Sequence, residues 1–318
     1  MKCFVTGGAG FIGSNLVDRL LLEGHRVTVN DNFSTGFMYF LNTKVHRPAL
    51  TIVEGDLLDQ KNLMRSMKGH DIVFHIAANA DVRFGFESPA KDLNQNTLAT
   101  FNVLESMRVN EISKIVFSST SAIYGDPKIT PTPEDAPFPQ QTSLYGASKL
   151  ACEGLIEAYC AGFNIQSWIF RFVSILGERY THGHVFDFYK QLEEHPKHLN
   201  VLGDGTQRKS YLYVQDCIDG IMCAIDKSKD PVNIFNLGSD DFCQVNDSIH
   251  WMCEYLDLRP DIKYSGGKKG WIGDNPFTYL DTKKICKLGW KPKYTIQESV
   301  LKTVKYLKDN PVVLERHR

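Results

Sequence analysis

The chain has 318 residues, of which 42% are apolar and 23% charged, and its formal net charge is -1 at pH 7. This balance is that of an ordinary globular protein, and it argues against a nucleic-acid partner and against a membrane span. The eight cysteines include no Cys-x-x-Cys pair, which favours reduced thiols and the cytoplasm over disulfides or zinc. Because the first predicted strand starts at the N-terminus, we expect no signal peptide.

The first residues predict a strand, a tight turn and a helix. Residues 2–6 form a short apolar run, and apolar residues recur at helical spacing from Phe11 to Leu21. Between them, Gly8, Gly10 and Gly13 satisfy Gly-x-Gly-x-x-Gly, and Gly7, Gly10 and Gly13 fit a looser form. Such a turn brings backbone N–H groups and a helix N-terminus to a pyrophosphate, although glycine turns also serve strand-to-helix packing.

The next predicted strand, residues 25–31, ends in an acid. Asp31 follows the glycines by the number of residues that, in dinucleotide-binding folds, places an acid at the hydroxyl groups of the adenosine ribose. A carboxylate there repels a 2′-phosphate, and residues 32–36 contain no Lys or Arg to receive one. The sequence therefore predicts NAD rather than NADP as the cofactor.

Further strands are predicted at 50–54, 71–76, 114–117 and 165–172, with helices between them. This alternation is typical of an α/β fold with a doubly wound parallel sheet of the Rossmann type. Ligands bind at the carboxyl ends of such strands. Asp56 lies at one such end, where it could accept from an adenine amino group or cap a helix. Ala77 and Ala78 follow the predicted strand at 71–76. Their small side chains would let the backbone lie close to a cofactor, or they serve only close packing within the protein.

Ser88 and Pro89 predict the start of a helix that runs to about Val109 and is apolar on more than one stripe. Beyond residue 174 the alternation weakens, and short elements with glycine-rich loops predict a smaller mixed α/β lobe over 175–318. We expect the first domain, residues 1–174, to be rejoined by about 211–237. His182 and His184 have no nearby Cys or acidic partners, so we predict a structural or substrate-loop role and no metal site.

Tyr145 and Lys149 lie four residues apart and therefore on one face of a helix that begins near Ser143. An adjacent ammonium stabilises a phenolate and lowers the tyrosine pKa, and NAD⁺ would add a second positive charge. Such a base could take a hydroxyl proton while the carbon beneath gives hydride to nicotinamide. A Tyr-x-x-x-Lys alone is usually a surface pair. Behind a dinucleotide-binding unit, with Thr120 as a hydroxyl relay, it predicts catalysis.

With these motifs the chain resembles the extended short-chain dehydrogenase/reductase family, in its NAD-dependent nucleotide-sugar epimerase and dehydratase group. The motifs that carry the resemblance are residues 6–13, Asp31, 55–57, 75–78, 118–125, 145–149, Arg208 and 211–216. The resemblance implies an NAD kept bound through the cycle and an active site of Tyr145, Lys149 and Thr120. It also implies a C-terminal lobe that holds the substrate's nucleotide diphosphate, and a homodimer formed through the long helix and the helix of Tyr145.

The resemblance extends to individual contacts. Cofactor contacts are expected from Gly7, Gly10, Phe11, Ile12, Gly13, Asp31, Asn32, Ser34, Thr35, Gly36, Asp56, Leu57, Ala77, Ala78, Asn96, Ser118, Tyr145 and Lys149. Substrate contacts are expected from Thr120, Arg83, Ser174, His184, Val201, Arg208 and Lys269. Ser174 and Lys269 stand where related epimerases have Asn and Arg, which leaves a shifted substrate pose or weaker binding open. Arg83 would suit a carboxylate at C6 or is a surface residue.

The segment 119–125 narrows the expected reaction because it contains no carboxylate. Dehydratases of the family carry an Asp-Glu pair beside the position of Thr120, and decarboxylases typically place Glu at the position of Ala122. Chemistry that needs only a hydride and one proton remains, as in UDP-glucose/UDP-galactose 4-epimerases. N-acetylhexosamine and hexuronate 4-epimerases stay open, as does decarboxylation with a carboxylate from elsewhere. A non-catalytic NAD(H)-binding sensor is the alternative of another class, but it would not need Thr120, Tyr145 and Lys149 together.

Overall fold

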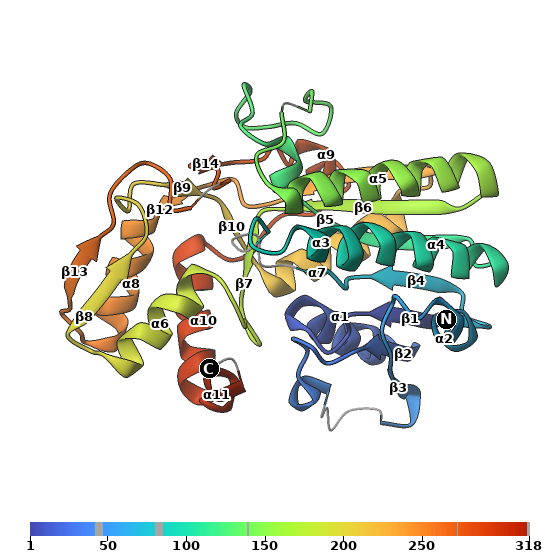
Figure 1. Cartoon of the computed structure of the whole chain (residues 1–318), viewed down its shortest axis with the longest axis horizontal. Coiled ribbons are helices and arrows are strands. Elements are labelled where there is room, and N and C mark those ends of the chain that lie inside the picture. Colours follow the sequence, from blue (N-terminus) through green and yellow to red (C-terminus); the bar gives the residue numbers. More distant parts are fainter. Residues whose placement is uncertain (42–46, 80–84, 139, 272, 317–318) are drawn as a thin grey trace. The chain divides into compact units, whose positions relative to one another are not determined.

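The computed structural model describes residues 1–41, 47–79, 85–138, 140–271 and 273–316 (Figure 1). The chain divides into two compact units. The first comprises residues 1–123, 144–171 and 221–235, and the second comprises 124–143, 172–220 and 236–318.

The first unit is built on a seven-stranded sheet, as the alternating pattern predicted. Its strands follow the order β11-β6-β5-β4-β1-β2-β3, in which β1 lies between β2 and β4 because the chain crosses over after β3. The pairs among β1 to β5 are parallel. The strands are β1 (Lys2–Thr6), β2 (Arg26–Asp31), β3 (Leu50–Glu54), β4 (Ile72–His75), β5 (Lys114–Thr120), β6 (Gln166–Phe172) and β11 (Val232–Leu237). The predicted doubly wound Rossmann-type architecture is confirmed.

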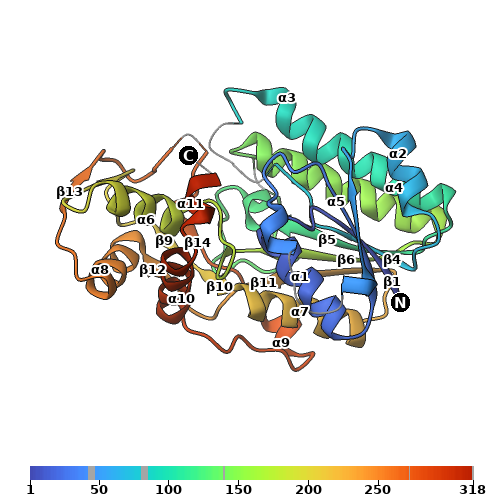
Figure 2. The same ribbon diagram turned by 90° about the horizontal axis from the view of Figure 1, so that it is seen from below.

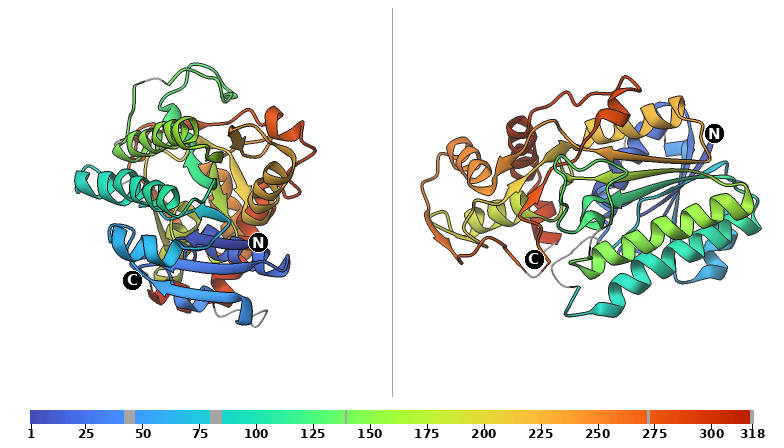
Figure 3. Two further views of the ribbon diagram at one scale, coloured as in Figure 1. Left: turned by 90° about the vertical axis from the view of Figure 1, so that its right-hand side faces the viewer. Right: turned by 90° about the horizontal axis from the view of Figure 1, so that it is seen from above.

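Helices cover this sheet on two sides. Figure 2 shows α1 (Phe11–Leu22) on one side and α2 (Gln60–Met67), α4 (Ala99–Val109) and α5 (Leu144–Phe163) on the other. The right-hand view of Figure 3 shows α4 and α5 side by side along their lengths. Short 3₁₀ turns lie at η1 (Met38–Leu41), η2 (Arg47–Ala49) and η5 (Ser121–Tyr124).

The helix predicted from Ser88 to about Val109 is interrupted. It consists of α3 (Pro89–Asp92), a π-helical turn η4 (Leu93–Leu98) and α4. π-helical turns occur mostly where one extra residue is accommodated, frequently at functional sites. The two apolar stripes that the sequence indicated are present: Val103, Leu104 and Met107 are buried, whereas Leu93, Leu98 and Phe101 are exposed.

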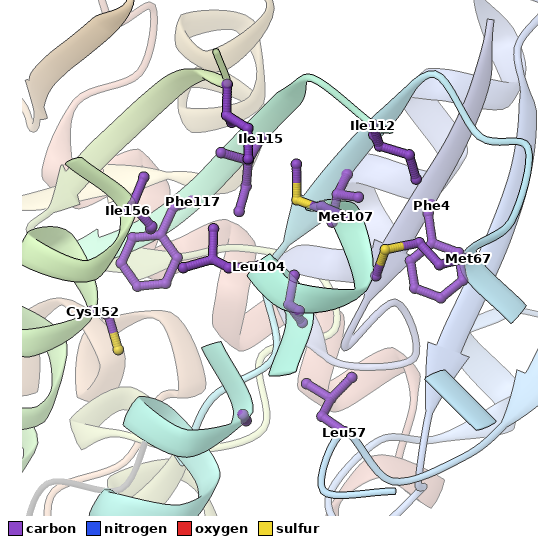
Figure 4. Packing of buried hydrophobic residues seen from close by; sticks show 14 of the residues in the cluster. Phe4, Leu57, Met67, Leu104, Met107, Ile112, Ile115, Phe117, Cys152 and Ile156 are labelled. Carbon is purple, nitrogen blue, oxygen red and sulfur yellow. The ribbon is translucent and has the colours of Figure 1, made fainter. Parts of the chain in front are cut away.

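One hydrophobic core of the first unit lies between the sheet and the side covered by α2, α4 and α5. Alternate residues of β5, Ile115 and Phe117, face this core because side chains of a strand alternate between its faces. Figure 4 shows Phe117 beside Leu104 and Ile156, and Phe4 beside Met67. Burial of each such side chain stabilises the fold by roughly 1.5–3 kcal/mol. This core packs β5 against the middle of α5, where Cys152 and Ile156 lie.

The second unit contains three small sheets. β7 (Ser174–Leu176) pairs with β10 (Tyr211–Tyr213), and β8 (His198–Val201) pairs with β13 (Asp261–Tyr264), both in parallel. The third sheet has the order β12 (Cys243–Gln244), β9 (Arg208–Lys209), β14 (Phe277–Thr278). The helices are α6 (His184–Glu194), α8 (Val245–Leu256), α9 (Lys283–Cys286), α10 (Ile296–Asp309) and α11 (Val312–Arg316), while α7 (Val214–Lys227) runs from the second unit into the first. The predicted small, mixed α/β lobe is confirmed.

Candidate active site

The turn after β1 has contacts that require glycine. Gly7 has φ +68°, and a Cβ there would lie 2.7 Å from the backbone of Ala77. A Cβ on Gly13 would overlap the carbonyl oxygen of Gly7. Gly10 is the N-cap of α1 and supplies no side-chain cap. The turn therefore presents first-turn N–H groups without a capping side chain, which is the geometry that an anionic pyrophosphate needs.

Asp31 joins this turn to the loop after β2. Its carboxylate accepts hydrogen bonds from the backbone N–H groups of Ala9 and Phe33, both at 2.9 Å. Burial raises the pKa of Asp31, and these two hydrogen bonds oppose the rise. A Cβ on Gly36 would lie 2.6 Å from Asp31 Oδ1, so the loop can approach the carboxylate only without a side chain there. An acceptor held in this way suits ribose hydroxyl groups.

Asn32 and Asp56 connect the ends of β2 and β3. Asn32 Nδ2 donates to Asp56 Oδ2 at 3.0 Å, while Asp56 Oδ1 accepts from the N–H of Leu58. The N-cap of α2 is Asp59, not Asp56, so helix capping does not account for Asp56. Asp56 also lines a pocket with Asn30, Val53, Glu54, Gly55, Asn62, Leu63, Arg65 and Ser66. Its contact with an adenine stays a prediction.

A buried histidine, which sequence reasoning assigned no role, ties the glycine turn to the helices. His75 Nδ1 lies 2.7 Å from Thr6 Oγ1, and its Nε2 lies 3.0 Å from Thr100 Oγ1. Thr100 in turn donates to Cys152 Sγ of α5. Burial, with a smaller effect of the Lys149 charge, lowers the pKa of His75 to about 3. His75 is therefore a neutral structural link and not an acid or base.

The predicted catalytic residues meet at the carboxyl end of β5. Tyr145, in the first turn of α5, forms a side-chain hydrogen bond with Thr120. Lys149, one turn further, donates from Nζ to the Ser118 carbonyl oxygen at 2.8 Å and lies 4.5 Å from the centre of the Phe117 ring. The structure thus brings Tyr145, Thr120, Lys149 and Ser118 together.

The electrostatics of this cluster differ from the expectation drawn from spacing. Burial raises the pKa of Tyr145, and the Thr120 hydrogen bond offsets only part of the rise. Burial also lowers the pKa of Lys149 to about 8, against the opposing effects of Cys152 and Glu153. Desolvation disfavours the charged form of each group and is the largest cause of both shifts.

A buried ion pair supports the cluster, and sequence reasoning did not find it. Arg171 of β6 donates to the Glu153 carboxylate of α5, with Nη2 at 2.7 Å from Oε2, and both side chains are at most 3% exposed. The Ser119 hydroxyl also donates to Glu153. Because Ser119 lies between Ser118 and Thr120, this carboxylate fixes the end of β5 to the helix that carries Tyr145 and Lys149.

The residues of the second unit that are expected to bind substrate each contact different neighbours. The Arg208 guanidinium lies 3.9 Å from the centre of the Phe277 ring, and Lys269 Nζ lies 3.4 Å from Asp126 Oδ2. Ser174 begins β7 and is exposed, whereas Val201 ends β8 and is buried. Arg83 lies outside the described residues, so its predicted role stays a prediction.

His184 is the first residue of α6, and its ring lies tilted against that of Tyr211, with ring centres 4.8 Å apart. Its Nε2 is buried and has no hydrogen-bond partner within the described part of the chain. Burial and then the Lys209 charge lower its pKa to about 3. Lys209, which the sequence did not indicate, is held by Asp274 at 2.7 Å. His184 is therefore neutral and retains a ring nitrogen for a ligand.

Over the ranges that the structure describes, no three His, Cys, Asp or Glu side chains gather where they could hold a metal ion. Within the same ranges, none of the helices is long and apolar enough to cross a membrane. None of the eight cysteines is joined to another in a disulfide.

Known proteins resemble the chain over nearly its whole length. Residues 3–238 match the model of the NAD-dependent epimerase/dehydratase family. A UDP-glucose 4-epimerase of Corynebacterium glutamicum is 31% identical over 312 residues, which cover 93% of this chain and 92% of that protein. A crystal structure of a UDP-galactose 4-epimerase is 38% identical, with a TM-score of 0.88 over 98% of this chain and 99% of its own.

A third relative has a crystal structure with both NAD and a sugar nucleotide bound. The UDP-glucuronic acid 4-epimerase of Bacillus cereus, in complex with UDP-glucuronic acid and NAD, is 26% identical, with a TM-score of 0.88 over 97% of this chain and 99% of its own.

Proposed function

This chain belongs to the NAD-dependent epimerase/dehydratase family, and from that premise we propose that it is a nucleotide-sugar 4-epimerase of the UDP-glucose/UDP-galactose type. One observation carries the proposal. Tyr145 is hydrogen-bonded to Thr120 beside the buried Lys149, at a strand end whose residues 118–125 contain no carboxylate. This arrangement offers one proton acceptor and no further acid or base of the kind that dehydration requires.

The residues of the first unit fit NAD, the cofactor of the family. The glycine turn between β1 and α1 would hold the pyrophosphate on bare backbone N–H groups. Asp31 would accept from the adenosine ribose, and Asp56 would meet the adenine. When bound, oxidised NAD supplies a hydride acceptor for C4 of the sugar and a positive charge beside it.

The chain's own residues move the proton. Tyr145 takes the proton of the C4 hydroxyl, through or beside Thr120, and holds it while the sugar is a 4-ketone. Lys149 is cationic below about pH 8 and supports the phenolate by its charge. Once the 4-keto sugar presents its other face, Tyr145 would return the proton to the C4 oxygen. Net chemistry is inversion at C4, with no net oxidation.

Substrate recognition is assigned to the second unit. Arg208 would bind the diphosphate, since a guanidinium offers two parallel N–H donors to phosphate oxygens. The aromatic rings of Phe277 and Phe242, 3.9 and 5.6 Å from its guanidinium carbon, support that group. The free ring nitrogen of His184 and the hydroxyl of Ser174 are further candidates for polar contacts with the nucleotide.

The experiment that tests this function is an NMR survey of the purified protein with UDP-, dTDP-, CDP- and GDP-sugars. A 4-epimerase interconverts equatorial and axial hydroxyl groups at C4 of at least one of them. The panel includes UDP-N-acetylhexosamines and UDP-hexuronates, which are substrates of the alternative 4-epimerases. Formation of a UDP-pentose with release of CO₂ from the hexuronate would instead identify a decarboxylase. If NAD binds but no sugar nucleotide changes, the chain is a non-catalytic NAD(H)-binding sensor.

We propose further that the protein is a cytoplasmic homodimer, for which its reduced cysteines and one apolar surface provide support. Leu93 is 59% exposed, Leu98 43% and Phe101 37%, all on η4 and α4, beside α5. Burying such side chains against a second copy would remove them from water. Sedimentation at micromolar concentration tests this proposal, and a monomer would contradict it.

A further inference from the structure

An asparagine of the second unit holds the backbone directly after η5. The carbonyl oxygen of Gly125 accepts a hydrogen bond from Asn275 Nδ2 at 2.6 Å. Gly125 is buried and has φ +54°, a conformation that favours glycine. A buried carbonyl group needs a partner, and here the partner lies 150 residues away in the sequence. The bond is therefore a tertiary contact and not part of a local turn.

Asn275 is itself fixed by two neighbours. Its Oδ1 accepts from the N–H of Phe277 at 3.1 Å, and its backbone carbonyl oxygen accepts from Lys209 Nζ. Lys209 also donates to Asp274 Oδ1 at 2.7 Å, and the Asp274 side chain is only 2% exposed. Rotation of the Asn275 amide would lose the bonds to both Phe277 and Gly125.

The 3₁₀ turn η5 joins Gly125 to the active site. It begins directly after Thr120 and ends directly before Gly125. Thr120 Oγ1 accepts from the backbone N–H of Ala122, within η5, at 3.1 Å. A hydroxyl group has one O–H donor and two lone pairs, so this bond leaves the donor and one lone pair for the side chain of Tyr145. The path of η5 therefore determines the direction of the Thr120 hydroxyl.

A second amide holds the last residue of η5. The Tyr124 hydroxyl donates to Asn236 Oδ1 at 2.9 Å, and Asn236 is completely buried. Asn236 Nδ2 donates in turn to the carbonyl oxygens of Thr132 and Asp281, at 2.9 and 3.1 Å. The end of η5 is thus held by two separate contacts, one to the side chain of Tyr124 and one to the backbone that follows it.

The loop that carries Asn275 also lies close to the other end of the segment between Thr120 and Tyr145. Gly273 has φ +90°, and a Cβ there would lie 2.8 Å from the carbonyl oxygen of Thr142. Only a residue without a side chain permits this approach. The loop therefore contacts both ends of that segment.

We propose that Asn275 is a positioning residue of the active site: by holding Gly125 it fixes η5, and η5 fixes the Thr120 hydroxyl for its hydrogen bond with Tyr145. This inference rests on the proposed roles of Tyr145 and Thr120 in proton transfer. Asn275 acts through the backbone at Gly125 and not on the substrate, so it affects turnover more than nucleotide binding.

Asn275→Asp tests this role. It keeps an oxygen for the N–H of Phe277 and replaces the donor to Gly125 by an acceptor, so the bond to the Gly125 carbonyl oxygen is lost. In the NAD-loaded protein, kcat should fall by roughly 10- to 100-fold with UDP-galactose, or with whichever sugar nucleotide of the NMR survey reacts, because slight misplacement of a catalytic group has such an effect. The affinity for UDP, measured by calorimetry, should stay unchanged. An unchanged kcat, or a loss of UDP affinity as large as the loss of kcat, overturns the proposal.

Hydrogen exchange gives a readout that needs no turnover. Backbone amides of residues 121–125 in NAD-loaded Asn275→Asp should exchange on the order of tenfold faster than in the natural chain, because the end of η5 has lost a hydrogen bond. Unchanged exchange would show that Asn275 does not anchor η5. If exchange rises but no sugar nucleotide reacts with the natural chain, the proposed function and the catalytic role of Asn275 are refuted, whereas the anchoring of η5 stands.

Asn310→Asp is the matched control. Asn310 is the C-cap of α10, and its Nδ2 donates to the Tyr306 carbonyl oxygen at 2.9 Å, so the substitution removes the same kind of bond elsewhere in the second unit. It should change neither kcat nor exchange at 121–125. Equal effects of the two substitutions would indicate a general loss of stability and overturn the proposal. If Asn275→Asp does not fold, Asn275→Ala, which loses the donor without adding a charge, replaces it with the same expected results.

Discussion

Lys149 donates a hydrogen bond from Nζ to the carbonyl oxygen of Ser118 at 2.8 Å. The bond joins α5 to the end of β5, one residue before Ser119 and two before Thr120. The ammonium is almost completely buried, with the Phe117 ring as its other neighbour. Such a group is unfavourable for folding and is therefore informative about function.

Replacing this lysine should stabilise the cofactor-free protein. A pKa that falls from 10.5 to about 8 on folding corresponds to a penalty of roughly 3 kcal/mol for the buried charge, offset by about 1 kcal/mol for the Ser118 hydrogen bond. Below pH 8 the penalty is fully present. Between pH 8 and 10.5 the unfolded chain binds the proton and the folded chain does not, so the stability of the natural chain rises with pH.

We therefore expect Lys149→Met to unfold at a higher denaturant concentration than the natural chain at pH 7, and the gap to close as the pH rises towards 10.5. Denaturant melts at several pH values measure this. A variant that is less stable by the same amount at every pH would show that the buried charge is not the cause.

Tyr145→Phe should abolish turnover and leave the cofactor in place. Loss of a positioned general base typically costs about 10²–10⁴-fold in rate. The side chain is half-buried and loses only its hydroxyl, so folding and NAD content should persist. Turnover by NMR and NAD content by absorbance after denaturation are the measurements. Unchanged turnover would remove Tyr145 from the mechanism.

Glu153→Gln should be strongly destabilising because it leaves the Arg171 charge buried and unpaired, at a cost of about 3–5 kcal/mol. The exposed pair of Glu105 and Arg108 offers a control, since Glu105→Gln should change stability far less. Ser119→Ala, which keeps the ion pair and removes only the strand contact, should lower kcat more than it raises KM. Equal loss of stability in the two Glu→Gln variants would refute the structural role of the buried pair.

Gly13→Ala should lose NAD because its Cβ would overlap the Gly7 carbonyl oxygen and force the turn open. Gly154→Ala is the matched control: it lies in α5, and its Cβ would meet no atom within 4 Å. That substitution should stabilise the helix by roughly 0.5–1 kcal/mol and leave NAD content unchanged. Retention of NAD by Gly13→Ala would mean that the turn does not bind the pyrophosphate.

The sheet and the glycine turn were predictable because each rests on local chemistry. Apolar runs bounded by glycine and polar residues mark the strands, and the glycine spacing marks the turn. The pairing of Tyr145 with Lys149 was equally predictable, since helical geometry alone places residues four apart on one face.

The supporting residues were not predictable because their partners are distant in sequence. Three different elements contribute Ser119, Glu153 and Arg171. From sequence alone, a single Glu in a helix is ordinarily predicted to be exposed to solvent. Asp92 and Asn96 lie in a polar stretch typical of a helix surface, and nothing local indicates that the helix widens there into a π turn. The prediction that the helix from Ser88 to about Val109 is apolar on two stripes was a partial indication of these polar residues. Two apolar stripes leave only one narrow face of the helix for its polar side chains.

The most direct test of the central claim uses UDP-galactose deuterated at C4, incubated with the NAD-loaded protein. A hydride that is removed and returned at the same carbon never exchanges with water. We therefore predict UDP-glucose that retains deuterium at C4, by NMR and mass spectrometry. UDP-glucose with hydrogen at C4, or no change of configuration at C4, would contradict the account.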